Sequence, residues 1–161
     1  MDQIEAIRAS HRPLKITTLF VGESAPVSGD FFYSRETQML RNMRTAVERT
    51  YGKTENFLRT FKQYGWYLDD LVLEPINDLK QKKERETKWW EAKGSLATRI
   101  KEYRPEAIVT LLLGMTHVVS EAAREAGFSG RLHTVPFPGN GQQKRFAIKM
   151  AEILPELPRL K

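Results

Sequence analysis

Apolar residues along this chain follow two spacings, which predict two kinds of secondary structure. Short apolar runs predict strands over residues 16–21, 66–73, 107–113 and 131–135, of which the first is expected to be buried and the third is the most apolar. Apolar positions three or four residues apart are typical of helices, which we expect before His11 and over residues 35–50, 54–64, 79–103, 116–126 and 142–153. Strands that alternate with helices favour a parallel sheet covered on both faces. We therefore expect a three-layer α/β/α sandwich with a mainly parallel four-stranded sheet.

Local signals set bounds within these helices. Thr54 can cap a first turn, so the third helix is expected to start there. Gly94 and Ser95 lower helix propensity, so the long helix is expected to break near them. The apolar residues that share one helix face are expected to point inward: Met39, Met43, Ala46 and Val47, and then Phe57, Leu58 and Phe61.

Length and composition indicate one compact domain over residues 1–161. The chain has 161 residues, 40% of them hydrophobic, which is enough to bury a core. No apolar run reaches the roughly 18 residues that a membrane span needs, and the start MDQIEAIRAS is too polar and acidic for a secretory signal. We expect a monomer in the cytoplasm that makes no membrane contact.

Cysteine and histidine usage narrows the chemistry. The sequence has no cysteine, which excludes disulfides, a cysteine nucleophile and cysteine-ligated zinc or iron–sulfur clusters. Its three histidines are scattered and lack the spacing of metal ligands. A protein-held metal is therefore disfavoured, and we expect no cofactor.

The net charge of the chain indicates what kind of partner the protein binds. The chain carries 26 Lys and Arg against 20 Asp and Glu, a formal net charge of +6, which favours a polyanion such as nucleic acid. The densest basic run, residues 80–88, alternates in sign and predicts a solvated helix face. Trp89 and Trp90 after it are expected to pack against helices rather than stack on bases.

The loops that follow the strands are the places to look for a site, because ligands of such folds bind beyond the carboxyl ends of the strands. The first loop, residues 22–26, and the fourth, residues 136–141, are rich in Gly and Pro and predict a stiff backbone. Neither has the spacing of a phosphate-binding loop, so a nucleoside-triphosphate enzyme is disfavoured. Phe31, Phe32 and Tyr33 follow the first loop, and they either fill the core or hold a ligand.

Several short segments, in order, resemble the uracil-DNA glycosylase superfamily over about residues 15 to 147. The turn GESAP at residues 22–26 is similar to the family's first motif, and GDFF at residues 29–32 with Met39 and Leu40 resembles its aromatic segment. Looser similarity follows at residues 67–72, 96–100, 104–109 and 113–114, and VPFP at residues 135–138 stands where the family has His-Pro-Ser-Pro. The resemblance implies a DNA repair enzyme that flips a base out of DNA and hydrolyses its N-glycosidic bond without a cofactor.

The resemblance also implies roles for residues near the first loop. Phe31 or Phe32 would stack on the flipped base, and Glu23 would position the attacking water or stabilise positive charge on the sugar. Asp70 stands about where the family has an Asn that reads uracil; an ionised Asp only accepts hydrogen bonds, which leaves room for a base other than uracil. The base-binding residues implied are Gly22, Ser24, Ala25, Pro26, Phe31, Phe32 and Asp70.

The second motif departs from the family, because Val135 stands in place of the histidine that contacts the leaving base. His133 is the candidate catalytic substitute, although two residues along a strand place it roughly 6–7 Å back; His117 is a further candidate. The segment after the motif would insert a wedge and contact phosphates. The DNA-binding residues expected there are Pro136, Phe137, Pro138, Gly139, Asn140, Gly141, Gln142, Lys144 and Arg145.

The function expected from the sequence is hydrolysis of the N-glycosidic bond of a flipped uracil, or of another deaminated base, in single- or double-stranded DNA. Two alternatives stay open. One is a non-catalytic nucleic-acid-binding relative that has kept the pocket and lost the histidine. The other is a protein that binds free nucleobases or nucleotides.

Overall fold

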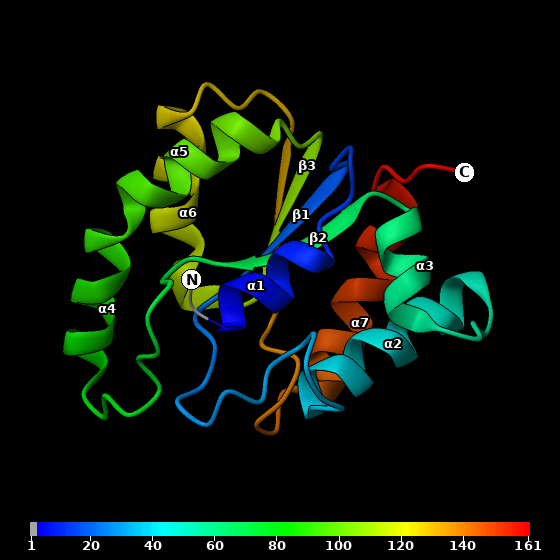
Figure 1. Ribbon diagram of the computed structural model, residues 1–161, viewed down its shortest axis with the longest axis horizontal. Helices are drawn as coiled ribbons and strands as arrows, with labels where there is room; N and C mark the ends of the chain where they lie inside the picture. Colours follow the sequence, from blue (N-terminus) through cyan, green and yellow to red (C-terminus); the bar gives the residue numbers. More distant parts are fainter. Residues whose placement is uncertain (1–2) are drawn as a thin grey trace.

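Four parallel strands form the centre of the fold (Figure 1). The computed structural model describes residues 3–161, and its strands are β1 (Thr18–Gly22), β2 (Trp66–Asp70), β3 (Ala107–Thr110) and β4 (Arg131–Thr134). Their order in the sheet is β2-β1-β3-β4, and each neighbouring pair is parallel. The expected α/β/α arrangement around a parallel four-stranded sheet is confirmed.

Helices cover both faces of the sheet (Figure 1). One layer holds α2 (Gln38–Tyr51), α3 (Phe57–Gln63) and α7 (Gln143–Ile153), and the other holds α4 (Lys82–Glu91), α5 (Lys93–Tyr103) and α6 (Thr116–Glu125). The N-terminal helix α1 (Gln3–Ser10) lies beside β2, and short 3-10 turns span Leu113–Met115 and Leu154–Glu156. Among the described residues, no helix combines the length and apolar character needed to cross a membrane.

The register of the strands brings their carboxyl ends together at one rim. Gly22 at the end of β1 pairs with Asp70 at the end of β2, and Thr110 at the end of β3 pairs with Thr134 at the end of β4. The loops after β1 and β4 therefore start from the same edge of the sheet, as expected from the sequence.

Aromatic side chains fill the space between β1, β2 and α3. The ring of Phe61 lies 5.4 Å from Phe20, 5.6 Å from Trp66 and 5.4 Å from Phe32, measured between centroids. Phe61 is buried, and so is Trp66. The aromatic segment after the first loop is thus joined to the core through Phe32.

The start of the third helix differs from the expectation. Helix α3 begins after Asn56, whose side chain accepts a hydrogen bond from the backbone N–H of Arg59 at 3.1 Å. The hydroxyl of Thr54 instead donates to Glu48 Oε2 at 2.8 Å. Asparagine caps a helix as well as threonine does, and Glu48 on α2 takes the threonine away from that role.

Other bounds also differ. Helix α2 begins at Gln38, because Thr37 caps it by accepting from Leu40 N at 3.2 Å, so residues 35–37 lie outside it. The long helical region begins at Lys82, and its break falls at Ala92; Gly94 and Ser95 lie within α5. Strands β2 and β3 end at Asp70 and Thr110, earlier than the apolar runs that predict them. Of the residues before His11, residues 1 and 2 lie outside the described part of the chain.

Phe61→Ala should lower the free energy of unfolding by about 3–5 kcal/mol, because removing a fully buried ring loses transfer energy and leaves a cavity. Trp90→Ala is the matched control, since this ring is 44% exposed. Denaturant titrations of both variants check the prediction. A loss for Phe61→Ala no larger than that for Trp90→Ala would contradict the aromatic core described here.

Candidate functional site

A cavity of about 580 Å³ opens where the first and fourth loops meet at the rim of the sheet. Its first side is the loop after β1, with Ser24, Ala25 and Pro26, and the side facing it is the loop after β4, with Phe137 and Pro138. The two Gly- and Pro-rich loops therefore enclose one site. This is the place where ligands of parallel α/β folds bind.

The fourth loop is held against α2. Asn42 Nδ2 donates to the carbonyl of Pro138 at 2.9 Å, and a Cβ on Gly139 would lie 3.0 Å from Gln38 Oε1. Asn140 and Gly141 turn the chain with φ angles of 51° and 82°, a conformation that favours Gly and Asn. The turn places Asn140 on the cavity wall.

Phe31 and Phe32 belong both to the core and to the wall of the cavity. They are 5% and 3% exposed, and both also line the cavity. Phe32 packs against Phe61, whereas Arg8 lies over the ring of Phe31 with its guanidinium carbon 5.4 Å from the centroid. Tyr33 does not line the cavity; its hydroxyl accepts from the backbone N–H of Leu68 at 2.6 Å and so fixes the segment to β2.

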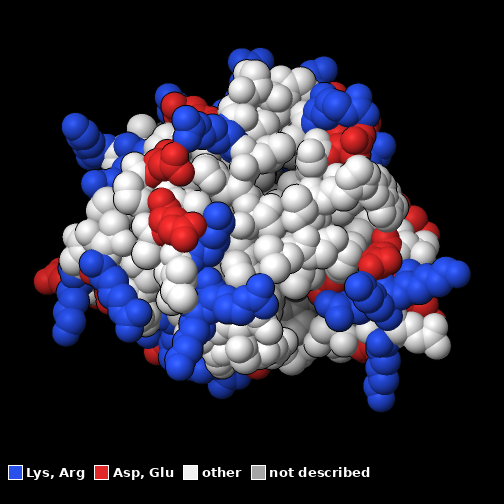
Figure 2. All heavy atoms as spheres, turned by 180° about the vertical axis from the view of Figure 1, so that it is seen from behind, with Lys and Arg blue, Asp and Glu red and all other residues white. Residues whose placement is uncertain are grey.

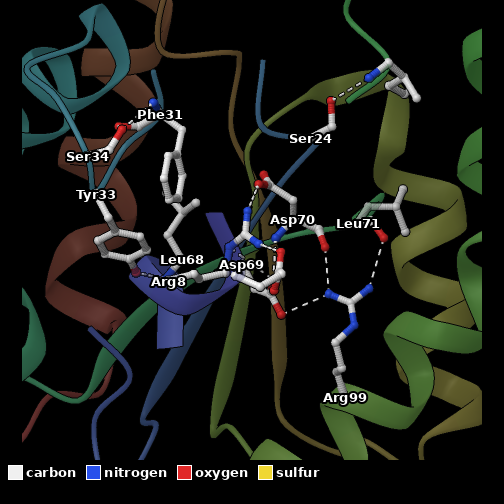
Figure 3. Close-up of polar contacts among 12 residues, drawn as sticks. Arg8, Ser24, Phe31, Tyr33, Ser34, Leu68, Asp69, Asp70, Leu71 and Arg99 are labelled. Atoms are coloured by element: carbon white, nitrogen blue, oxygen red, sulfur yellow. Dashed lines mark hydrogen bonds and ion pairs between the residues drawn. The ribbon is translucent and has the colours of Figure 1, made fainter. Parts of the chain in front are cut away.

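Two adjacent carboxyl groups end β2 and point to opposite faces of the sheet, as successive strand residues do. Asp69 faces α5, where Arg99 Nη1 donates to its Oδ2 at 2.9 Å and the hydroxyl of Tyr103 donates at 3.0 Å. Arg99 also bonds the backbone carbonyls of Asp70 and Leu71 at 2.7 and 3.0 Å. Asp69 therefore serves to hold α5 on the end of β2 (Figure 3).

Asp70 faces the cavity from the sheet and is 5% exposed. Arg8 Nη2 donates to its Oδ2 at 2.6 Å (Figure 3). Burial raises the pKa of Asp70 to about 6, although the charge of Arg8 works in the opposite direction. The same carboxyl can therefore accept hydrogen bonds when ionised and donate one when protonated, close to neutral pH.

Glu23 lines the cavity and is held by two residues of α4. Trp89 Nε1 donates to its Oε2 at 2.8 Å, Arg85 Nε donates to the same oxygen at 3.1 Å, and Arg85 Nη2 bonds its Oε1. The Glu23 side chain is 13% exposed. A carboxylate bound to a guanidinium through both oxygens is fixed in position, which suits it to stabilise a nearby cation.

Two amide side chains add donors to the cavity. Asn77 Oδ1 accepts from the backbone N–H of Val27 at 2.9 Å, and Gln38 Oε1 accepts from Asn140 N at 3.4 Å. Both residues line the cavity, and their NH₂ groups make no hydrogen bond to another described residue. Amide donors beside a carboxyl acceptor suit a ligand edge that carries both C=O and N–H groups.

The structure also shows which expected residues lie elsewhere. His133 does not line the cavity; its Nε2 is buried without a hydrogen-bond partner, and burial lowers its pKa. Lys144 and Arg145 are exposed on the first turn of α7, outside the cavity lining. His117 is exposed and lies against Trp90, with ring centroids 5.3 Å apart. Gly22 lies beneath Asp70, and Pro136, Gly139 and Gly141 shape the backbone of the fourth loop.

Four residues of the candidate site escaped the sequence analysis: Arg8, Gln38, Asn77 and Arg85. Arg8 belongs to a short polar helix, and Arg85 to the alternating run that is otherwise largely exposed. The only sequence signal for Arg85 is its position one helical turn before Trp89, which places both on one face of α4.

No metal centre accompanies these groups in the described part of the chain, where no cluster of three or more His, Asp or Glu could hold an ion. No family model matches the chain, and no curated protein is significantly similar to it. What the site can do therefore follows from its own geometry.

The raised pKa of Asp70 predicts how stability changes with pH. The folded protein holds this proton more tightly than the unfolded chain, whose aspartates titrate near 3.9. The stabilisation is complete below about pH 4 and is lost as the pH rises through the folded value of about 6. Asp70→Asn should remove this contribution.

The measurement is the free energy of unfolding between pH 4 and 7 for wild type and Asp70→Asn, because the difference between the two proteins isolates one carboxyl. We expect wild type to lose stability relative to the variant as the pH rises across this range. A constant difference would show that Asp70 titrates alike in the folded and unfolded states.

Proposed function

We propose that the protein is a DNA glycosylase-like hydrolase that takes a flipped nucleobase into the cavity and cleaves its N-glycosidic bond. The observation that carries the proposal is the cavity of about 580 Å³, in which aromatic and apolar side chains face the carboxyl group of Asp70. A nucleobase has flat apolar faces and a polar edge, and this site offers a partner for each.

The aromatic side of the cavity accounts for base binding. Phe31 follows the first loop and Phe137 lies in the fourth, and both line the cavity, so each can contact a base face. Stacking on an aromatic ring contributes about 1–3 kcal/mol per base, comparable to the few kcal/mol that base extrusion costs. Arg8 over Phe31 keeps this ring in place.

Asp70, Gln38 and Asn77 account for recognition of the base edge. The carboxyl accepts from a ring N–H, and the two amide groups donate to carbonyl oxygens. Uracil and other deaminated bases present such an edge, and we propose uracil first. An ionised Asp70 repels a base carbonyl beside it, and protonation, which becomes substantial as the pH falls to about 6, relieves this repulsion.

Glu23 is the proposed catalytic group, and no cofactor is required. A water oxygen bonds to the sugar carbon while the bond to the base nitrogen breaks and its electron pair leaves with the base. The proton that the water loses ends on the departing base. Glu23 stabilises the positive charge on the sugar and holds the water through Oε1, which accepts only one bond from Arg85 and retains a lone-pair site. His133 has no step in this scheme, because it lies outside the cavity lining.

DNA is the proposed partner, through charges beside the cavity. In the view of Figure 2, Lys and Arg side chains lie mainly around the edges with Asp and Glu among them, and uncharged residues occupy much of the middle. Lys144 and Arg145 follow the fourth loop and are exposed, so they are the proposed phosphate contacts. The net charge of +6 agrees with a polyanionic partner.

A second candidate function is base binding without catalysis. The ion pair between Glu23 and Arg85 favours it, because the positive charge of Arg85 offsets the negative charge that would stabilise a cationic sugar. Binding of a free nucleobase or nucleotide is the third. Salt separates these last two, since affinity for DNA falls steeply with ionic strength and affinity for a neutral base does not.

Purified protein incubated with oligonucleotides that carry uracil, hypoxanthine or xanthine should release at least one of these bases, seen as alkaline cleavage at the abasic site. Glu23→Gln should slow release about 10²–10⁴-fold and leave DNA affinity nearly unchanged. Glu74→Gln is the matched control, since Glu74 pairs with Lys88 and does not line the cavity.

Release of no base from any of these strands would overturn the catalytic proposal. Binding to the lesion-bearing strand in preference to the undamaged one would then support the non-catalytic candidate. Equal rates for Glu23→Gln and wild type would remove Glu23 from the mechanism.

A further inference from the structure

The two carboxylate oxygens of Asp70 have different surroundings. Oδ2 accepts from Arg8 at 2.6 Å, whereas Oδ1 has no hydrogen bond to any described residue. Oδ1 lies over Gly22, where an added Cβ would come within 2.5 Å of it. The close approach of this oxygen to the backbone requires the glycine, and it leaves Oδ1 as the acceptor available to a ligand in the cavity.

Arg8 holds this arrangement through two hydrogen bonds, and its buried Nε makes none to a described residue. Nη1 bonds Glu5, Nη2 bonds Asp70, and Nε lies 3.6 Å from Asp69 Oδ1. The Arg8 side chain is 2% exposed and does not line the cavity, so it contacts Asp70 from within the protein. A planar guanidinium held by two hydrogen bonds fixes the carboxyl group that it binds.

We propose that Arg8 is a positioning residue that sets the base specificity of the cavity by fixing Asp70 with Oδ1 toward the ligand. The cavity then prefers a base whose edge offers an N–H to that oxygen. This inference deepens the proposed function and rests on it, since the ligand is taken to be a nucleobase. Arg8 itself touches neither the base nor the reacting bond.

The charges around Asp70 support a preference for a ligand that carries a hydrogen-bond donor. Arg8 from α1 and Arg99 from α5 are the cations, and they face three carboxyl groups, those of Glu5, Asp69 and Asp70. Tyr103 from α5 donates to Asp69, and Arg85 at the mouth is paired with Glu23. The cluster thus carries one negative charge more than its cations balance, which an N–H donor on the ligand would offset.

The state of Asp70 gives the preference a pH dependence. Above a pH of about 6 the ionised carboxyl accepts from a base N–H, and below it the protonated carboxyl donates instead. Selection for a base N–H should therefore weaken as the pH falls from 7 to 5. A residue that only stabilised the fold would not produce this profile.

The experiment compares affinities for two oligonucleotides, one with uracil and one with N3-methyluracil, which lacks the ring N–H. Wild type at pH 7.5 should bind uracil about 10- to 100-fold more tightly, as for a hydrogen bond to a charged group. Arg8→Gln should reduce this ratio to below about 3-fold while folding as judged by circular dichroism.

Arg12→Gln is the matched control. It removes the same charge just after α1, but Arg12 pairs with Glu102 and lies over Tyr103, away from Asp70. Its affinity ratio should equal that of wild type. Carbon-detected NMR of the Asp70 carboxyl should show a higher pKa in Arg8→Gln than in Arg12→Gln, because a favourable cation has been removed.

The outcomes separate this inference from the proposed function. If wild type binds neither oligonucleotide in preference to undamaged DNA, both the proposed base-binding function and the role of Arg8 are overturned. If wild type binds uracil but Arg8→Gln keeps the full ratio, only the role of Arg8 is overturned. Should Arg8→Gln fail to fold, Arg8→Lys replaces it, since a single nitrogen cannot span Glu5, Asp69 and Asp70; an unchanged ratio there also overturns the role.

Discussion

Two buried carboxyl groups at the end of β2 impose the main constraint on this structure. Asp69 and Asp70 are 1% and 5% exposed, and charges removed from water need partners with good geometry. Arg99 supplies one from α5 and Arg8 the other from α1. Elements far apart in the sequence are thereby drawn to the same rim, and removing one partner would leave a buried charge unpaired.

The hydrogen-bond partners of these two carboxyl groups determine the chemistry of the cavity. Arg99 and Tyr103 of α5 donate hydrogen bonds to Asp69, so this carboxyl group has a structural role. Asp70 is satisfied at one oxygen only and lies among apolar side chains, where its pKa rises. A carboxyl group held rigidly in such surroundings is typical of a functional site. The aromatic segment adds the apolar faces, fixed to β2 through Tyr33.

The sequence predicts the framework well because apolar periodicity reports burial directly. The four strands, their parallel arrangement and the meeting of the first and fourth loops all follow from it. Helix starts are harder to predict, since Thr54 and Asn56 are equally able to cap and only the position of Glu48 decides between them. Arg8 and Arg85 could not be identified, because each acts on a carboxylate that lies 62 residues away in the chain. Such pairings depend on tertiary contacts, which a single sequence does not reveal.

The proposed function requires that a base enter the cavity. A crystal structure of the protein with a uracil-containing oligonucleotide, made with a 2′-fluoro sugar to slow cleavage, tests this most directly. We predict uracil in the cavity with its ring N–H on Asp70 Oδ1 and one face against Phe31 or Phe137. DNA bound along another surface, with every base still stacked and the cavity free of nucleotide, would contradict the account.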